Sequence, residues 1–264
     1  MKKTLLASLL IAGTLPLSAQ ADTIFGIYAG AGRWTQEYSG TFGSSPSDSN
    51  AACLPACNFD IDLNDDLGLD EEDGDTLWIA VEHPVPFLPN VKFERNELKS
   101  SGRNQLNEAF TYGDETYVAN TTVVTDFDLS HNDYVLYYEV LDNWVNIDIG
   151  LDIKQFDGSV AVSDADGVIP SVTEELDAPI PLLYLAAKVE LPLSGLSFGG
   201  QASGISAAGA TLKDIRFNIG YEFSFGLGIE AGQRTMTIEI DPDEEDVYGD
   251  LEFKGNYVAA TYHF

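Results

Sequence analysis

Long hydrophobic runs are missing from this sequence. The longest apolar stretch lies between Leu5 and Leu17, and no uninterrupted apolar run reaches the roughly 18 residues that a membrane-spanning helix needs. If the mature chain enters a membrane, it must therefore do so with strands, because only helices and closed barrels satisfy their backbone hydrogen bonds in lipid.

Basic residues are also scarce. The 264 residues include 13 Lys and Arg against 43 Asp and Glu, which gives a formal net charge of −30 at pH 7. This balance excludes nucleic acid as a partner, because the phosphates need the opposite charge. Acidic residues repel one another in a small core, so we expect most of them on long solvated loops.

Cysteine and histidine are nearly absent. The two cysteines, Cys53 and Cys57, lie in the stretch CLPAC, and an exported protein would oxidise this pair to a disulfide. A metal-binding pair is the weaker interpretation, because no further cysteine or nearby histidine completes a ligand set. There is no Ser-His-acid order, glycine-rich phosphate loop or Cys/His metal spacing elsewhere, so we expect no metal and no cofactor.

The N-terminal residues have the pattern of a secretory signal peptide. Lys2 and Lys3 precede the apolar stretch, and small residues then lead to a cleavage site between Ala21 and Asp22. The sequence therefore predicts a signal peptide at 1–21 and export of the remainder. Residues 22–264 have no internal repeat or low-complexity linker, which favours one large all-β domain.

Polar and apolar residues alternate with a period of two along most of the chain. In residues 144–154, WVNIDIGLDIK, Ile149 and Leu151 share one face of a strand, and Asp148 and Asp152 share the other. Segments of this kind, about ten residues long, suit tilted strands that cross a bilayer. We expect them at 23–35, 75–83, 90–99, 123–140, 144–156, 179–191, 196–204, 212–223, 227–240 and 251–264. The pattern predicts a closed antiparallel transmembrane β-barrel of about ten strands, with eight or twelve as the alternatives.

The connections between these segments alternate in length. Long acidic or Gly/Ser-rich connections are expected at 36–74, 100–122, 157–178 and 241–250, and a moderately long one at 205–211. Short turns separate the other strands, and the three prolines of EHPVPFLPN, 82–90, place that stretch among them. Short periplasmic turns and long extracellular loops are typical of a barrel in the bacterial outer membrane.

The last residues favour the same location. Tyr262 and Phe264 end an amphipathic strand, and they resemble the C-terminal signal that the barrel-assembly machinery recognises. We expect this machinery, outer-membrane lipid and lipopolysaccharide as partners of a monomer.

Four sequence blocks carry a resemblance to a known family. They are DLGLDEED at 66–73, EHPVPFLPN at 82–90, DLSHNDYVLYYEVLDN at 128–143 and LDIKQFDG at 151–158. These blocks resemble a largely uncharacterised family of proteobacterial outer-membrane β-barrel proteins. The resemblance implies location and architecture, and it brings no catalytic residues with it.

Catalytic candidates are few. The stretch DFDLSHND contains Asp126, Asp128, His131 and Asp133 at the expected outer end of a strand, where a rim hydrolase acting on lipid or peptide could hold its acids and histidine. Alternation puts Asp126 and Asp128 on one face and His131 and Asp133 on the other, which favours a solvated strand end over catalysis. The acidic run at 62–75 lacks the spacing of a calcium loop and is a candidate only for weak binding of divalent cations.

The expected inward face is rich in charge. We expect a polar lumen network of Glu82, Asp148, Lys188, Glu190, Arg216, Glu222, Glu230 and Arg234. Buried acids are costly unless paired, and arginine offers a planar donor fork for pairing. The sequence therefore favours a barrel whose lumen is filled by salt-bridged side chains, with a structural or interaction role for its acidic loops. A narrow small-solute channel and the rim hydrolase are the alternatives, and an enzyme is the less favoured interpretation.

Overall fold

The computed structural model describes residues 25–44, 57–58, 60–113, 115–241 and 247–264. All regular elements in these ranges are strands. Within the same ranges, no helix has the length and hydropathy to cross a membrane.

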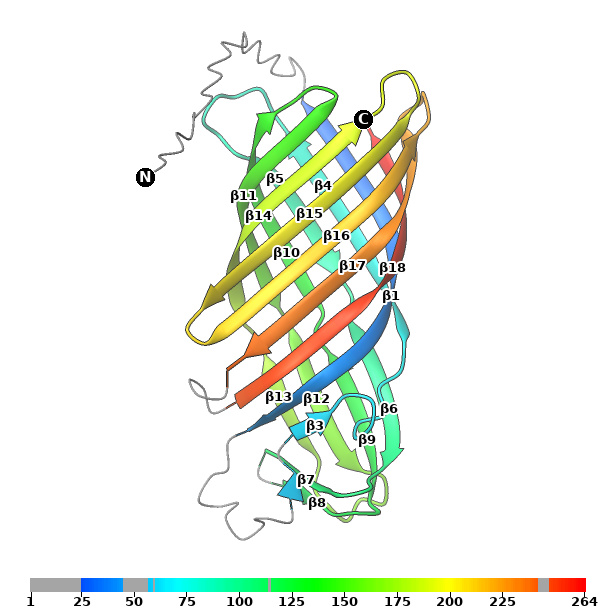
Figure 1. Ribbon diagram of the computed structural model, residues 1–264, viewed down its shortest axis with the longest axis vertical. Helices are drawn as coiled ribbons and strands as arrows, with labels where there is room; N and C mark the ends of the chain where they lie inside the picture. The colour runs from blue at the N-terminus through cyan, green and yellow to red at the C-terminus, as the bar shows by residue number, and fades with distance from the viewer. Residues whose placement is uncertain (1–24, 45–56, 59, 114, 242–246) are drawn as a thin grey trace, which may run out of the picture.

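Ten of the described strands form a closed antiparallel barrel (Figure 1). In ring order they are β1 (Gly26–Ser44), β4 (Glu72–Glu82), β5 (Asn90–Asn96), β10 (His131–Leu141), β11 (Val145–Phe156), β14 (Pro179–Glu190), β15 (Leu196–Ala207), β16 (Ala210–Glu222), β17 (Leu227–Ile240) and β18 (Val247–His263). Pairing of β18 with β1, from Tyr28 opposite His263 to Ser44 opposite Val247, closes the ring. The predicted ten-stranded barrel is confirmed.

Alternation along each strand separates an apolar outer wall from a polar lumen. Leu183, Phe217 and Ile149 are 75%, 65% and 51% exposed on the outside, whereas Lys154 and Arg234 are buried inside. A wall of exposed large apolar side chains has no stable place in water and matches the lipid-facing band of a transmembrane barrel.

The turns between β4 and β5, β10 and β11, β14 and β15, and β16 and β17 are short and lie at one end of the barrel. The proline-rich turn at 83–89 is among them, as predicted. Asn90, the first residue of β5, accepts a hydrogen bond of 3.1 Å at Oδ1 from the amide of His83. Within the turn, Phe87 adopts a φ of 66°. β1 begins and β18 ends at this same end (Figure 1).

One turn at the opposite end is shorter than the sequence suggests. β15 and β16 are joined by two residues, Ala208 and Gly209, with φ of 49° and 72°, and Ala207 pairs directly with Ala210. Two positive φ angles are the geometry of a type I′ hairpin, which matches the twist of the flanking strands. The expectation of a moderately long connection at 205–211 is therefore wrong.

The prediction of one strand across 123–140 is also wrong. The chain forms β9 (Thr122–Asp128) and β10, interrupted at Leu129 and Ser130. The side chain of Asp128 accepts a hydrogen bond of 2.8 Å from the amide of Ser130, while Leu129 turns inward and becomes buried. A side chain that bonds a nearby amide competes with the strand ladder and breaks it locally.

Beyond this break, four strands continue the wall as a second sheet. β6 (Lys99–Gln105), β9, β12 (Gly158–Asp164) and β13 (Val172–Leu176) pair in the order β13-β12-β9-β6 and follow or precede β5, β10, β11 and β14 in the chain. Much of 100–122 and 157–178, expected as loops, is thus strand. We call this sheet the extension.

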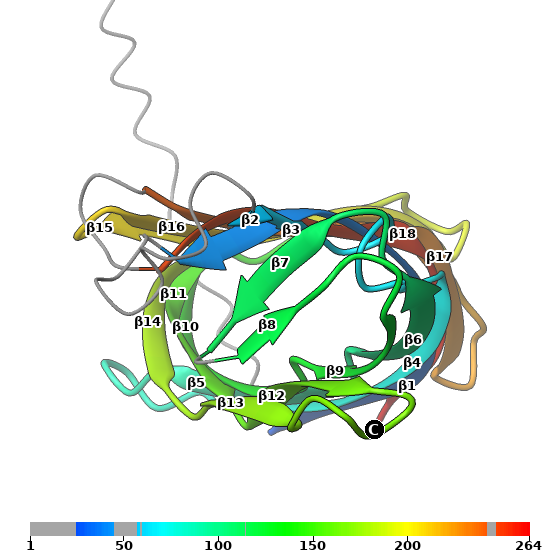
Figure 2. The ribbon, with the colours of Figure 1, turned by 90° about the horizontal axis from the view of Figure 1, so that it is seen from below.

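Smaller elements lie at the mouth of the barrel. β3 (Asp60–Asp62) pairs with the end of β1, and β2 (Cys57–Asn58), β7 (Ala109–Tyr112) and β8 (Glu115–Tyr117) form a small separate sheet. Figure 2 shows the β7–β8 hairpin lying across the opening. The hydroxyl groups of Tyr112 and Tyr117 donate hydrogen bonds of 2.9 and 2.8 Å to the carbonyls of Val160 and Val162, which attaches the hairpin to β12.

Candidate functional site in the barrel lumen

A network of buried charges lies across the middle of the lumen. It contains four cations, Lys92, Lys154, Arg216 and Arg234, and three anions, Glu94, Asp133 and Asp214. These four cations are a large share of the 13 basic residues of the chain. We call this group the ionic layer.

The first half of the ionic layer surrounds Glu94. Its carboxylate contacts Lys92 Nζ at 2.8 Å and Arg234 Nη1 at 3.6 Å, and it accepts a short hydrogen bond from Arg216. In the ring of ten strands, β5, which carries Glu94, lies opposite β16, which carries Arg216. Their bond therefore spans the lumen from wall to wall.

The second half surrounds Asp214. Arg234 donates to it through Nε at 2.9 Å and Nη2 at 2.6 Å, a bidentate arrangement that is among the strongest that side chains form. Lys154 Nζ lies between two carboxylates, 2.7 Å from Asp133 and 3.1 Å from Asp214. Asn96 accepts from Arg234 at 2.5 Å and donates to Asp133 at 2.9 Å. Arg234 joins the two halves, because it contacts both Glu94 and Asp214.

An apolar core fills the lumen on the side of the long connections. Arg234 lies 4.7 Å from the ring centroid of Trp34, and Trp34 begins a cluster of buried residues that reaches into the extension. The cluster includes Leu63, Leu67 and Leu69 from the segment before β4 and Phe110 and Tyr117 from the hairpin at the mouth. The ionic layer is therefore covered on this side by packed apolar side chains.

The side of the short turns holds a small vestibule. Its volume is about 230 Å³, and Trp78, Lys92, Asp148, Gln201 and Arg216 are among its lining residues. Arg216 is both a wall of the vestibule and a member of the ionic layer, so the vestibule ends where the ionic layer begins.

Six of the eight predicted network residues belong to the ionic layer or line this vestibule. Arg216 and Arg234 lie in the ionic layer, whereas Asp148, Lys188, Glu222 and Glu230 line the vestibule. Lys188 and Glu190 form a half-exposed pair at 2.6 Å close to the short turns. Glu82 accepts a hydrogen bond of 2.9 Å from the hydroxyl of Tyr137.

Sequence reasoning missed Lys92, Glu94 and Asn96 on β5. A signal was available, because these three alternate with Val91, Phe93 and Arg95 and so share the inward face. The signal is weak, because only Val91 and Phe93 mark the opposite face of the expected strand at 90–99 as apolar.

The four catalytic candidates are separated by the wall of the barrel. Asp126 is exposed on β9, and Asp128 lies 3.3 Å from Lys99. His131 and Asp133 are buried in the lumen beneath the apolar core. Ligand atoms of His131, Asp133 and Asp214 lie within 4.8 Å of one another, but the ammonium of Lys154 already lies between the two carboxylates. This arrangement supplies no acid and histidine pair facing the exterior.

Acids of the predicted cation-binding run serve as acceptors in a turn. Asp62 Oδ1 accepts hydrogen bonds of 2.8 Å from the amides of Asn64 and Asp65, and Asp66 Oδ2 accepts one of 2.9 Å from the amide of Asp62. Burial raises the pKa of the Asp66 carboxyl. Weak binding of divalent cations here stays a prediction.

Some predicted features lie outside the described residues. These are the signal peptide with its cleavage site at Ala21 and Asp22, and Cys53 of the expected disulfide with Cys57. Tyr262 and Phe264 are described: both are exposed on the outside, and their rings meet edge to face at 4.5 Å.

Comparisons with known proteins find only low similarity. No family model and no curated protein matches it. Among solved structures it is similar to the outer membrane protease OmpT from Escherichia coli, with 9% identity, coverage of 93% of this chain and 98% of that chain, and a TM-score of 0.49. It is also similar to the P. putida toluene transporter TodX, with 8% identity, coverage of 90% and 89%, and a TM-score of 0.30. Scores at this level carry no argument about activity, and the architecture rests on the strand pairing of this chain.

Proposed function

We propose that this protein is an integral β-barrel of the bacterial outer membrane without a continuous passage, and that it has a structural or interaction role at the cell surface. The apolar outer wall, the short turns at the end where β1 begins and β18 ends, and the extension at the other end support this location. In this orientation the extension and the mouth hairpin face the exterior.

The ionic layer is the observation that carries the proposal. Its bonds join opposite walls of the barrel, and its members are almost fully buried. An ion or solute crossing the lumen would have to break these buried charge pairs, which costs several kcal/mol for each charge. The apolar core beyond the layer adds a second barrier.

The exterior supports an interaction role through its acidity. Asp126, Glu174 and Glu175 are exposed on the extension. Their partners would be cationic surfaces or divalent ions, because like charges repel a second acidic surface. We further propose that Tyr262 and Phe264 engage the barrel-assembly machinery during insertion, and that the barrel then works as a monomer.

A planar-bilayer recording tests the closed lumen. Protein that has been inserted into a lipid bilayer, and whose folding is established by a change of gel mobility on boiling, should give no unitary conductance steps. The second candidate function, a small-solute channel, is favoured by the vestibule, and reproducible steps of one size would establish it in place of the closed barrel.

A further inference from the structure

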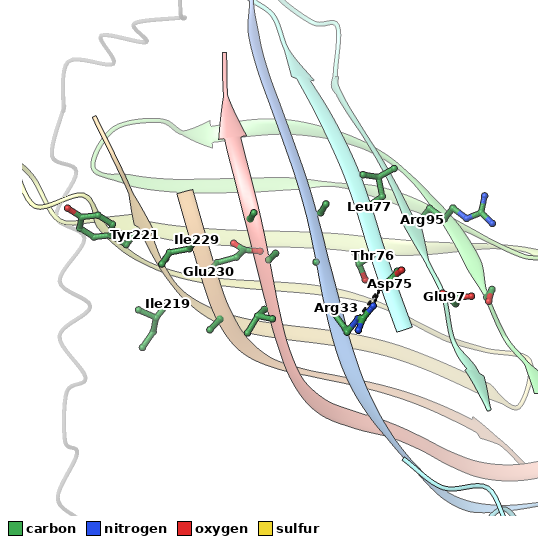
Figure 3. A pocket seen from close by; sticks show the side chains of 18 of the residues that line it. Arg33, Asp75, Thr76, Leu77, Arg95, Glu97, Ile219, Tyr221, Ile229 and Glu230 are labelled. Carbon is green, nitrogen blue, oxygen red and sulfur yellow. Dashed lines mark hydrogen bonds and ion pairs between the residues drawn. The ribbon is translucent and has the colours of Figure 1, made fainter. Parts of the chain in front are cut away.

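A furrow crosses the lipid-facing wall. It has a volume of about 1060 Å³ and is lined by residues of seven neighbouring barrel strands, from β15, through Leu196, to β5. A row of outward residues, each paired with the next across neighbouring strands, marks its course: Tyr221, Ile229, Ala260, Ala31, Leu77 and Arg95. Figure 3 shows Tyr221 and Ile229 at one end and Leu77 and Arg95 at the other.

Small side chains make the furrow. Ala31 and Ala260 occupy the middle of the row, and Ala231 lies beside them in the wall of the furrow, whereas the residues at both ends are larger. With neighbouring strands about 4.8 Å apart, five steps give a length of roughly 24 Å. A shallow apolar trough of that length and one side chain wide fits an extended acyl chain.

Arg95 ends the furrow at a change of polarity. On the outward faces, the apolar residues give way to Arg33 and Asp75 on β1 and β4, to Arg95 on β5 and to Asn132 on β10. Strands continue from this level toward the extension, so it corresponds to the headgroup region of the external leaflet. Tyr134, 47% exposed next to this level, is an interfacial aromatic of the kind that borders such bands.

The charge of Arg95 is not compensated within the described part of the chain. Arg33 pairs with Asp75 at 3.1 Å, and Lys99 lies 3.3 Å from Asp128, but Arg95 is exposed and has no ion pair or hydrogen bond with a described residue. Two acids line the same end of the furrow, but Asp75 pairs with Arg33 and Glu97 lies 3.8 Å from Lys99, which leaves the Arg95 guanidinium without an acid partner among the described residues. Its planar fork suits a phosphate, which can accept two parallel hydrogen bonds.

We propose that this furrow is the binding site of one lipopolysaccharide molecule. One acyl chain of the lipid would lie over Ala31 and Ala260, and Arg95 would bind a phosphate of its headgroup. The proposal rests on the outer-membrane location given above, which puts the Arg95 end in the external leaflet, where lipopolysaccharide is the phosphate-bearing lipid.

Retention of lipid through purification tests the charge. Wild-type protein, Arg95→Ala and Lys254→Ala would be extracted in mild detergent, washed, and assayed for bound lipopolysaccharide and phospholipid by mass spectrometry. Lys254 is the matched control, because it is an exposed basic residue on β18 outside the furrow and its loss changes the net charge equally. We expect about one lipopolysaccharide per barrel in the wild type and in Lys254→Ala, and roughly tenfold less in Arg95→Ala.

Ala260→Phe tests the furrow without removing a charge. The new ring would fill the trough, so we expect the same loss of lipopolysaccharide as in Arg95→Ala. Gel mobility before and after boiling shows for each variant that the barrel has folded. Full retention by Arg95→Ala, equal loss by Lys254→Ala, or phospholipid in place of lipopolysaccharide in the wild type would each overturn the proposal. The conductance recording uses none of these variants. A negative result for the lipid site therefore leaves the proposal of a closed lumen standing, and a conducting lumen leaves the proposal of the lipid site standing.

Discussion

Lys154 offers a direct test of the ionic layer. Its side chain has no exposed surface, and Nζ is the shared partner of Asp133 and Asp214. Lys154→Met keeps the length and much of the volume of the stem and removes only the charge and its donors. Asp214 would keep both bonds to Arg234, whereas Asp133 would keep one bond to the neutral amide of Asn96.

The expected loss follows from this difference. Removing one partner of a buried ion pair typically costs about 3 to 5 kcal/mol, because an uncompensated charge stays behind. Since Asp214 remains paired and only Asp133 is left without a cation, we expect a loss of about 3 kcal/mol in the free energy of unfolding. Adding Asp133→Asn removes the remaining charge, and the double variant should recover part of the loss.

Lys188→Met is the matched control. Lys188 lies on the neighbouring strand β14 and pairs with Glu190 at 2.6 Å, but both side chains are about half exposed. An exposed pair contributes about 0 to 1 kcal/mol, so this variant should unfold nearly as the wild type does. Urea unfolding in lipid vesicles, followed by tryptophan fluorescence, measures all the variants. Equal losses for Lys154→Met and Lys188→Met, or a loss below about 1 kcal/mol for Lys154→Met, would refute the description of the layer as a buried, paired network.

Three further predictions address the wall, the orientation and a surface turn. Ile149→Arg puts a charge on the lipid-facing side, at a cost of about 2 to 4 kcal/mol. It should therefore reduce the yield of heat-modifiable barrel far more than Asp148→Arg does, because Asp148 faces the lumen. Equal yields would mean that the inward and outward faces of this strand are assigned the wrong way round. On intact cells, a membrane-impermeant thiol reagent should label Val168→Cys, because Val168 is 82% exposed in the connection between β12 and β13. The same reagent should label Phe87→Cys only after the outer membrane is permeabilised, although Phe87 is 96% exposed in a short turn. The opposite pattern would mean that the barrel has the inverse orientation in the membrane. Hydrogen bonds from the backbone amides of Asp166 at 3.0 Å and Val168 at 2.9 Å lower the pKa of the exposed Asp164 carboxyl. A lowered pKa keeps this carboxylate charged at neutral pH, and the hydrogen bonds are lost only as the pH falls through that pKa. Asp164→Ala should therefore speed hydrogen exchange of the Val168 amide at pH 7. Unchanged exchange would contradict this role of Asp164.

The barrel itself could be predicted because its rule is local. Side chains of a strand alternate, so Ile149 and Asp148 are assigned to opposite faces by adjacent letters of the sequence. The same rule covers Lys92 and Glu94, although they were not recognised. Strand number follows from counting such segments, and it needs no knowledge of which segments meet.

The extension could not be predicted by this rule. Residues 123–140 alternate on both sides of a short polar run, Ser130 to Asp133, and the break at Leu129 and Ser130 depends on whether the Asp128 side chain bonds a backbone amide. Short strands such as β6 and β13 become strands because neighbours in the sheet supply their hydrogen bonds. Considered alone, the polar composition of these segments favours a loop. Pairing with neighbouring strands in the sheet overrides this local preference.

The charge pairs of the lumen lie beyond sequence reasoning for a related reason, and they explain how the closed ring is specified. Arg216 and Arg234 occupy directly paired positions on β16 and β17 and point to the same side, an arrangement that is unfavourable in an open hairpin because like charges face each other. Asp214 on β16 offsets part of this repulsion within the hairpin itself. The rest of the repulsion between the two arginines is offset by Glu94, which lies 122 residues from Arg216 in the chain. Glu94 comes within reach of Arg216 only when the opposite wall of the barrel has formed. Closure of the barrel thus brings the anion to the two cations, and a register that misplaced β5 by one residue would turn Glu94 toward lipid and leave two buried guanidinium groups with one carboxylate.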